Sequence, residues 1–255
     1  MKLFCISLER STERREAFHK NWIEGLGFNI EFFNAVDKNL IPNSDIEVAQ
    51  KQLDKLSFTP YGTFFRHKYS LSGIMACTRS HLTLLKSIED EIDDQGVVIF
   101  EDDVLPLEGA ENLEERISLA RKYSPQIESI ICNGFKEPRQ MYGLQVIEQT
   151  RNKINIMWDE KIHATVVPES KSSIVRISPP GSFFNWYSRD GVRRMIKLIE
   201  GKDFMSVDIF YGAFAKKGVL GILTPGIGYH PPMSEAGSFI TTPPFTYFHL
   251  DERKN

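Results

Sequence analysis

Short apolar runs alternate with segments of helical periodicity through the first half of the chain, and this alternation limits the possible folds more than any other feature. The predicted strands span residues 3–8, 28–36, 97–100 and 127–132, and helical patterns lie at 11–16, 78–92 and 113–123. Such alternation is typical of a mostly parallel sheet with helices on both faces. We therefore expect an α/β fold, built as a single domain over residues 1–255.

The second half of the chain is less regular. Short β-like pieces surround residues 154–158, and the polar stretch 168–180 suits a loop over a site. A predicted helix over 189–199 and a predicted strand over 219–223 restore the alternation. Proline and glycine interrupt any sustained period between residues 37 and 72, so we expect irregular structure or short helices there.

Composition narrows the functional classes. With 31 basic and 34 acidic side chains the formal charge is −3, so no overall positive field attracts a nucleic-acid backbone. The three cysteines are odd in number and widely spaced, which suits reduced thiols in the cytoplasm rather than a disulfide framework. The apolar stretch 1–8 is too short for a signal peptide or a membrane span.

Three consecutive carboxylates, Glu101, Asp102 and Asp103, follow the apolar run 97–100. Their mutual repulsion is costly unless a cation lies among them. In open α/β sheets, ligands bind beyond the carboxyl ends of the strands, and oxygen ligands there suit Mg²⁺ or Mn²⁺. Such an ion would bridge two phosphate oxygens of a nucleotide sugar and stabilise the departing diphosphate. The same triplet also fits a solvated loop or the N-terminus of a helix.

Three stretches carry a family resemblance. They are Ile6-Ser7-Leu8-Glu9-Arg10-Ser11 with Arg14-Arg15, then Gly73-Ile74-Met75-Ala76-Cys77-Thr78-Arg79-Ser80-His81-Leu82, then Phe100-Glu101-Asp102-Asp103-Val104. In this order and separation they resemble glycosyltransferase family 25, which includes lipooligosaccharide and collagen galactosyltransferases. The resemblance is good over the first 110 residues and thins to Val207-Asp208 and the region 225–238. Ile74, Ala76 and Leu85 depart from the family pattern, which bears on the donor and acceptor more than on the reaction class.

The resemblance implies a GT-A-like fold, with residues 1–135 binding the nucleotide sugar and 136–255 shaping the acceptor site. It also implies an inverting hexose transfer, commonly galactose from UDP-galactose, to a lipooligosaccharide, lipopolysaccharide or related surface glycan. The expected cofactor is Mn²⁺ or Mg²⁺, and the partners are a UDP-sugar donor and an oligosaccharide or glycolipid acceptor. A lipid-linked acceptor would bring the enzyme to the inner leaflet of the membrane, although no basic amphipathic helix is evident.

The end of the first predicted strand supplies the first candidates for holding the nucleotide. Ser7, Leu8 and Arg10 lie at that end, where ligands collect. The guanidinium groups of Arg14 and Arg15 suit a diphosphate or the face of a uracil ring, and a solvated helix face explains them equally well.

Further donor-binding candidates come from three other places. Asp37, after the second predicted strand, suits contact with the ribose or base, although it also fits an ordinary turn aspartate. Ser80 would position His81, whose neutral imidazole would donate to the donor sugar or phosphate; a packed histidine is the plain alternative. Glu101 and Asp102 complete this set. Cys77 is given an inert packing role.

The cation and the acceptor hydroxyl need other groups. Asp103 is the predicted direct metal ligand, with Asp102 and the late residue His230 beside it; a surface turn also accounts for His230. Asp208 lies among apolar residues, and desolvation there raises the basicity of its carboxylate. We therefore expect Asp208 to be the general base, with the N-cap of a helix over 209–216 as its alternative role.

Two rival functions use the same residues. An acidic cluster after a strand also serves metal-dependent phosphohydrolases, but these usually need several more His or Asp ligands, and none of the six histidines has a paired metal-ligand spacing. A non-catalytic sugar-binding module of the same fold is the other, although the intact acidic triplet argues against it.

Overall fold

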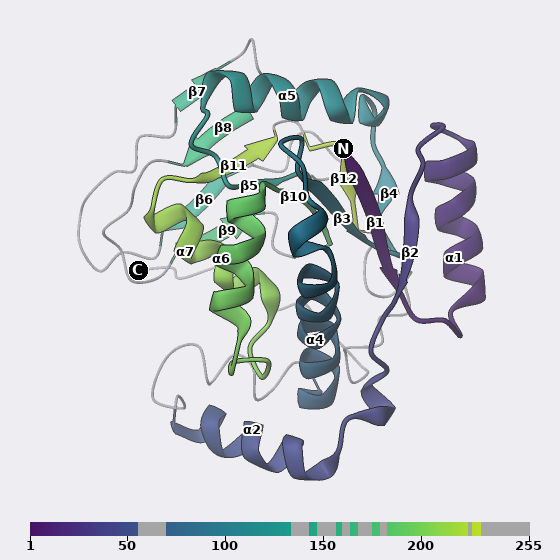
Figure 1. Cartoon of the computed structure of the whole chain (residues 1–255), viewed down its shortest axis with the longest axis vertical. Helices are drawn as coiled ribbons and strands as arrows, with labels where there is room; N and C mark the ends of the chain where they lie inside the picture. The colour runs from purple at the N-terminus through teal and green to yellow at the C-terminus, as the bar shows by residue number, and fades with distance from the viewer. Residues whose placement is uncertain are drawn as a thin grey trace, which may run out of the picture.

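The computed structural model describes residues 1–55, 70–133, 143–146, 157–159, 164–167, 175–178, 183–223 and 226–230. Its centre is an eight-stranded sheet in the order β2-β1-β3-β10-β5-β11-β8-β7 (Figure 1). The strands of this sheet are β1 (Lys2–Ser7), β2 (Glu31–Asn34), β3 (Val97–Glu101), β5 (Ser129–Ile131), β7 (Met157–Asp159), β8 (Ala164–Val167), β10 (Phe184–Tyr187) and β11 (Leu220–Leu223). Two small ribbons join β4 (Leu105–Pro106) to β12 (Gly228–Tyr229) and β6 (Gly143–Val146) to β9 (Val175–Ser178).

Most strands of the central sheet run in one direction. β1 is parallel to β2 and to β3, and β5 is parallel to β11. Two strands run the other way, because β10 is antiparallel to β3 and β5, and β8 is antiparallel to β11 and β7. The predicted α/β class with a mostly parallel, mixed sheet is therefore confirmed.

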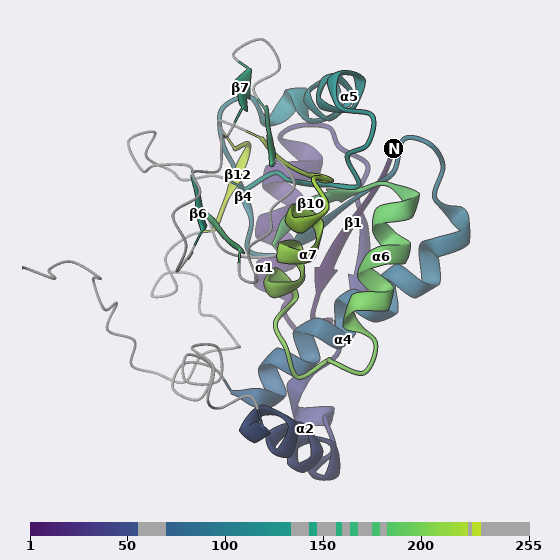
Figure 2. The same ribbon diagram turned by 90° about the vertical axis from the view of Figure 1, so that its left-hand side faces the viewer.

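Side chains alternate between two cores, one on each face of the sheet. Leu3 and Cys5 of β1 lie in one core, and Phe4 and Ile6 lie in the other. The first core is covered by α1 (Thr12–Phe18), the π-helical turn η1 (His19–Glu24) and α5 (Leu113–Tyr123). The second is covered by α4 (Leu71–Ile88), α6 (Arg189–Ile199), η5 (Val207–Phe210) and α7 (Tyr211–Lys216), and α4 packs beside α6 (Figures 1 and 2). Helices on both faces are confirmed as well.

Several element boundaries follow the sequence pattern closely. α5 and α6 cover the predicted ranges 113–123 and 189–199, and β3 lies on the predicted strand. α4 begins at Leu71 rather than Thr78, because the Ser70 hydroxyl accepts a hydrogen bond from the amide of Gly73 at 3.1 Å and caps the earlier start.

Between residues 37 and 72 we expected irregular structure or short helices, and the described part of this range contains helices, one of them of ordinary length. After a short 3₁₀ turn, η2 (Lys38–Leu40), the thirteen-residue helix α2 (Asn43–Lys55) begins. It buries only Ala49 and Leu53, which pack in a small third core shared with α4. Residues 56–69, and all of 168–180 except strand β9, lie outside the described residues.

The described residues also form the 3₁₀ turns η3 (Glu89–Glu91) and η4 (Ala110–Asn112). Within the described ranges, no helix combines the length and apolar character that crossing a bilayer demands.

Candidate active site

The predicted site forms where β1 and β3 end side by side. Ile6 of β1 is paired with Glu101 of β3 in the parallel ladder, so the residues that follow both strands emerge at one edge of the sheet. A pocket opens there between the strand ends, the segment after β2 and one face of α4. Of the residues predicted from sequence, it is lined by Ser7, Leu8, Arg14, Ser80, His81, Glu101, Asp102 and Asp103.

A tight turn holds the three acids in place. The carbonyl of Glu101 accepts a hydrogen bond from the amide of Val104 at 3.2 Å, which closes the turn. The carbonyl of Val104 accepts another at 2.8 Å from the indole of Trp22, a fully buried side chain of the first core. The carboxylates therefore project from a fixed backbone rather than from a mobile loop end.

Arg14 lies against two of the three acids. One of its guanidinium nitrogens is 2.7 Å from Asp102 Oδ1 and also forms an ion pair with Asp103. Asp102 accepts a further hydrogen bond from the Ser7 hydroxyl at 2.6 Å. Burial nevertheless raises the pKa of Asp102 to about 6, against the opposing effects of Arg14 and Ser7.

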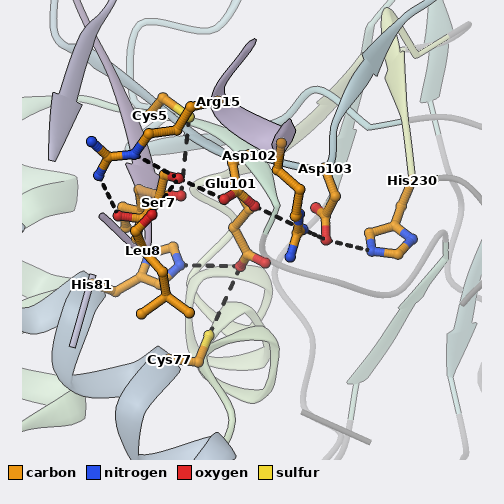
Figure 3. A network of polar contacts seen from close by, with 12 residues as sticks. Cys5, Ser7, Leu8, Arg15, Cys77, His81, Glu101, Asp102, Asp103 and His230 are labelled. Atoms are coloured by element: carbon orange, nitrogen blue, oxygen red, sulfur yellow. Dashed lines mark hydrogen bonds and ion pairs between the residues drawn. The ribbon is translucent and has the colours of Figure 1, made fainter. Parts of the chain in front are cut away.

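Asp103 has a different electrostatic balance. Burial alone would raise its pKa, but the hydrogen bond from His230 and the positive charges of His230 and Arg14 outweigh it, so the pKa is lowered. His230 Nε2 lies 3.0 Å from Asp103 Oδ2 (Figure 3). The other carboxylate oxygen, Oδ1, is buried and has no hydrogen-bond partner among the described residues.

This arrangement fits a divalent cation. A buried carboxylate oxygen without a partner is costly, and a bound cation is one of the few groups that would satisfy it. Asp102 and Asp103 offer the oxygen ligands that Mg²⁺ and Mn²⁺ prefer, with the His230 imidazole next to them.

Glu101 turns toward α4 instead. His81 Nε2 lies 3.2 Å from Glu101 Oε1, and Cys77 Sγ lies 3.9 Å from the same oxygen (Figure 3). Burial is the main cause that raises the pKa of the Cys77 thiol well above its usual value. Cys77 was assigned only a packing role from the sequence. The signal that would have found it is its spacing of four residues from His81, which places both on one face of a helix.

Ser80 is a connecting residue. Its hydroxyl donates to the carbonyl of Ala76 at 2.7 Å and accepts from the amide of Val36 at 2.8 Å. It therefore fixes α4 to the segment after β2, where Lys38, not identified from the sequence, also lines the pocket.

Five predicted residues do not line the pocket: Arg10, Arg15, Asp37, Asp208 and His230, of which His230 lies against Asp103. Arg10 and Asp37 pair with each other, with Arg10 Nε 2.7 Å from Asp37 Oδ2. Arg15 donates to the carbonyl of Ser7 at 2.9 Å and to Asn34 Oδ1 at 2.6 Å, so it ties β1 to β2 behind the site. Arg15 does not contact the acids directly, but it contacts Ser7, whose hydroxyl donates a hydrogen bond to Asp102.

Asp208 also lies outside the pocket lining, but its carboxylate is near that of Glu101. Burial is the main cause that raises its pKa, and the negative charge of Glu101 adds to the rise. Asp208 in turn raises the pKa of Cys77, which places its carboxylate near both groups. Asp208 Oδ1 is buried and has no hydrogen-bond partner among the described residues.

Comparison with known families gives first the class of protein: the chain is a glycosyltransferase, an enzyme that moves a sugar from a nucleotide-sugar donor to an acceptor. More particularly, it belongs to glycosyltransferase family 25 (LPS biosynthesis protein), whose sequence model matches residues 1–177. The matched part contains the acidic triplet, Arg14, Cys77 and His81, and it ends before Asp208 and His230. Among curated proteins, no sequence matches the chain significantly.

Proposed function

We propose that this glycosyltransferase transfers a hexose, galactose from UDP-galactose, to a lipooligosaccharide or lipopolysaccharide acceptor with inversion at the anomeric carbon. The observation that carries the proposal is the buried acidic turn at the end of β3, with Asp103 Oδ1 unsatisfied among the described residues and His230 beside it. We assign the fold to the GT-A type, with residues 1–135 as the donor half and 136–255 as the acceptor half. The enzyme works in the cytoplasm and meets a lipid-linked acceptor at the inner leaflet.

The pocket suits the donor. Ser7 and Leu8 at the end of β1 form its floor next to the acids, where a nucleotide would lie across the strand ends. Arg14 presents a guanidinium group that matches the geometry of a diphosphate. His81 and Glu101 lie next to each other in the pocket lining and offer polar contacts to the sugar or phosphate.

Asp103, Asp102 and His230 would hold the Mn²⁺ or Mg²⁺ ion. When bound, the ion would supply positive charge against the diphosphate as it leaves. Arg14 forms ion pairs with Asp102 and Asp103. Its guanidinium group therefore neutralises part of the negative charge at the site.

Asp208 is the proposed general base. In the transfer, a bond forms between the acceptor oxygen and the anomeric carbon while the bond from that carbon to the diphosphate oxygen breaks. The proton of the acceptor hydroxyl passes to the Asp208 carboxylate, which desolvation has made more basic than an ordinary aspartate.

A transfer assay tests the proposal. UDP release from UDP-galactose is measured with Mn²⁺, with and without a lipooligosaccharide acceptor, for the wild type, Asp103→Asn and the control Asp190→Asn, whose side chain is 78% exposed on α6. We expect acceptor-dependent release in the wild type and the control, and a loss of roughly 100-fold or more in Asp103→Asn. Release that ignores the acceptor would instead indicate a phosphohydrolase, and full activity in Asp103→Asn would refute the assigned cation site.

A further inference from the structure

A second cluster of ligand atoms lies in the pocket, separate from Asp103 and His230. The ligand atoms of Cys77, His81 and Glu101 all lie within 4.8 Å of one another. Figure 3 shows Cys77 and His81 both directed at the Glu101 carboxylate, whereas Asp103 is directed at His230.

Rigid elements hold this cluster together. Cys77 and His81 lie one turn apart on α4, and the next turn of that helix buries Leu84 and Leu85 completely against the sheet. Glu101 is the last residue of β3, in the middle of the sheet. Three ligands from a packed helix and a central strand are thus positioned before any ion arrives.

Burial holds the His81 side chain in place. It is only 1% exposed, and the ring nitrogen that faces Glu101 and would bind an ion is Nε2. The orientation of this ligand atom is therefore set by packing.

The donor atoms select a type of ion. One sulfur, one nitrogen and one oxygen form a softer set than the carboxylates of Asp102 and Asp103, and such sets favour Zn²⁺ over Mg²⁺ or Mn²⁺. Tetrahedral zinc with ordinary bond lengths separates its ligand atoms by about 3.4 to 3.6 Å. Here the Glu101 oxygen lies 3.2 Å from the His81 nitrogen and 3.9 Å from the Cys77 sulfur. Both distances lie within a few tenths of an ångström of the tetrahedral values, and the Cys77 and His81 ligand atoms lie within 4.8 Å of each other.

We propose that Cys77, His81 and Glu101 bind Zn²⁺, and that the bound ion excludes the nucleotide-sugar donor. On binding, a bond forms between Cys77 sulfur and zinc, the thiol proton leaves to solvent, and no group is oxidised or reduced. Water completes the coordination. The exclusion of the sugar donor by zinc rests on the proposed function, in which His81 and Glu101 contact the nucleotide sugar. When the same two side chains coordinate zinc, they are no longer available to the nucleotide sugar.

Cobalt substitution tests the site without any substrate. The full-length protein, stripped of metal, is titrated with Co²⁺, which takes the same ligands and gives a thiolate charge-transfer band in the near ultraviolet. We expect the band in the wild type and in Cys132→Ala, whose thiol is buried in the first core, and its loss in Cys77→Ser. Zn²⁺ should displace Co²⁺ and bind at least tenfold more weakly to Cys77→Ser. His81→Gln provides a second ligand variant, and circular dichroism checks that each variant is folded.

If the wild type shows no band, or if the band persists in Cys77→Ser, the proposed zinc site is refuted.

The exclusion of the sugar donor is measured separately, by the affinity for UDP-galactose in the presence of Mn²⁺ with and without Zn²⁺. We expect zinc to weaken donor binding at least tenfold in the wild type and to leave it unchanged in Cys77→Ser. Unchanged or tighter binding with zinc overturns exclusion. A protein that binds no nucleotide sugar at all refutes the proposed function and exclusion with it, while the cobalt spectrum still decides the metal site.

Discussion

The imidazole of His230 lies 3.0 Å from Asp103 Oδ2, although 127 positions separate the two residues in the chain. A short ribbon brings them together, because Tyr229 of β12 pairs with Leu105 of β4, two residues beyond Asp103. The late part of the chain is thereby fixed against the acidic turn, and the proposed cation site depends on that ribbon.

Substitution at Gly228 should disturb this ribbon. A Cβ at this position would lie 2.6 Å from the Phe184 ring and 2.9 Å from Val104, both buried. We expect Gly228→Ala to lower the free energy of unfolding by about 1–3 kcal/mol and to weaken Mn²⁺ binding by moving His230. Urea denaturation and calorimetric titration with Mn²⁺ measure the two effects. His230→Gln should also weaken Mn²⁺ binding, but with a smaller loss of stability than Gly228→Ala. Equal Mn²⁺ affinity in both variants and the wild type would contradict the assignment of His230 to the cation site.

Arg14 should stabilise the fold by neutralising the negative charges of Asp102 and Asp103, and a bound divalent ion should be able to take over this role. In Arg14→Ala the carboxylates of Asp102 and Asp103 lose the positive charge of this guanidinium group, and we expect the free energy of unfolding to fall by about 1–3 kcal/mol. Mn²⁺ should then raise the melting temperature more in Arg14→Ala than in the wild type. Thermal unfolding with and without Mn²⁺ measures this. Arg10→Ala is the control, because Arg10 forms an exposed pair with Asp37 and its loss should change stability by less than about 1 kcal/mol. An equal response to Mn²⁺ in all three proteins would refute the idea.

Asp102 should make stability depend on pH. Its pKa in the folded protein is about 6, above the ordinary value of about 4 in the unfolded chain, so the folded state binds more protons between these values. The free energy of unfolding of the wild type, relative to Asp102→Asn, should therefore fall as pH rises from about 4 through 6 and then level off. A difference of about two pKa units corresponds to about 3 kcal/mol at most. Urea denaturation of both proteins in chelator across this range measures the difference, and a difference independent of pH would be the contrary result.

Asp208 should control the acid limb of the activity profile. A general base must be ionised, so kcat/KM should fall as pH drops through its raised pKa, above the range of an ordinary aspartate. Asp208→Asn should lose about 100-fold to 10,000-fold in kcat. Ser206→Ala is the matched variant, because the hydrogen bond from Ser206 lowers the pKa of Asp208. Removing that bond should move the acid limb to higher pH and largely retain the rate at the plateau. A limb at the same pH in Ser206→Ala would argue for another base.

Local signals in the sequence predicted a large part of the fold. The run at β3 is β-branched and aromatic and ends in charge, and α6 has a strong apolar stripe that includes Val192 and Met195, so each is recognisable without its neighbours. Sheet order was not predictable in this way, since the place of β10 between β3 and β5 depends on contacts between distant segments. The bounds of α2 were not predicted, because the prolines and glycine of the region 37–72 argue against a sustained helix, although none of them lies within Asn43–Lys55.

For the candidate site, the sequence predicted which edge of the sheet carries the acids and put His230 beside Asp103, but it did not predict that Arg14 pairs with Asp102 and Asp103. Arg10 and Asp37 were both assigned to the donor, yet each has the other as a counter-ion outside the pocket. Arg14 and Arg15 are neighbours with different surroundings, since only Arg14 reaches Asp102. A helix turns adjacent residues about 100° apart, so two similar arginines take separate roles that their sequence does not distinguish.

Strand β10 joins β3 on one side to β5 on the other, and it begins seven residues after the family match ends. A fragment cut at that boundary would leave both neighbours with open hydrogen-bonding edges in the middle of the sheet, where exposed strands invite aggregation. Chimeras that exchange C-terminal segments between relatives should therefore retain residues 184–187 with the N-terminal part, because the edge of sequence similarity is not a place where this molecule can be divided.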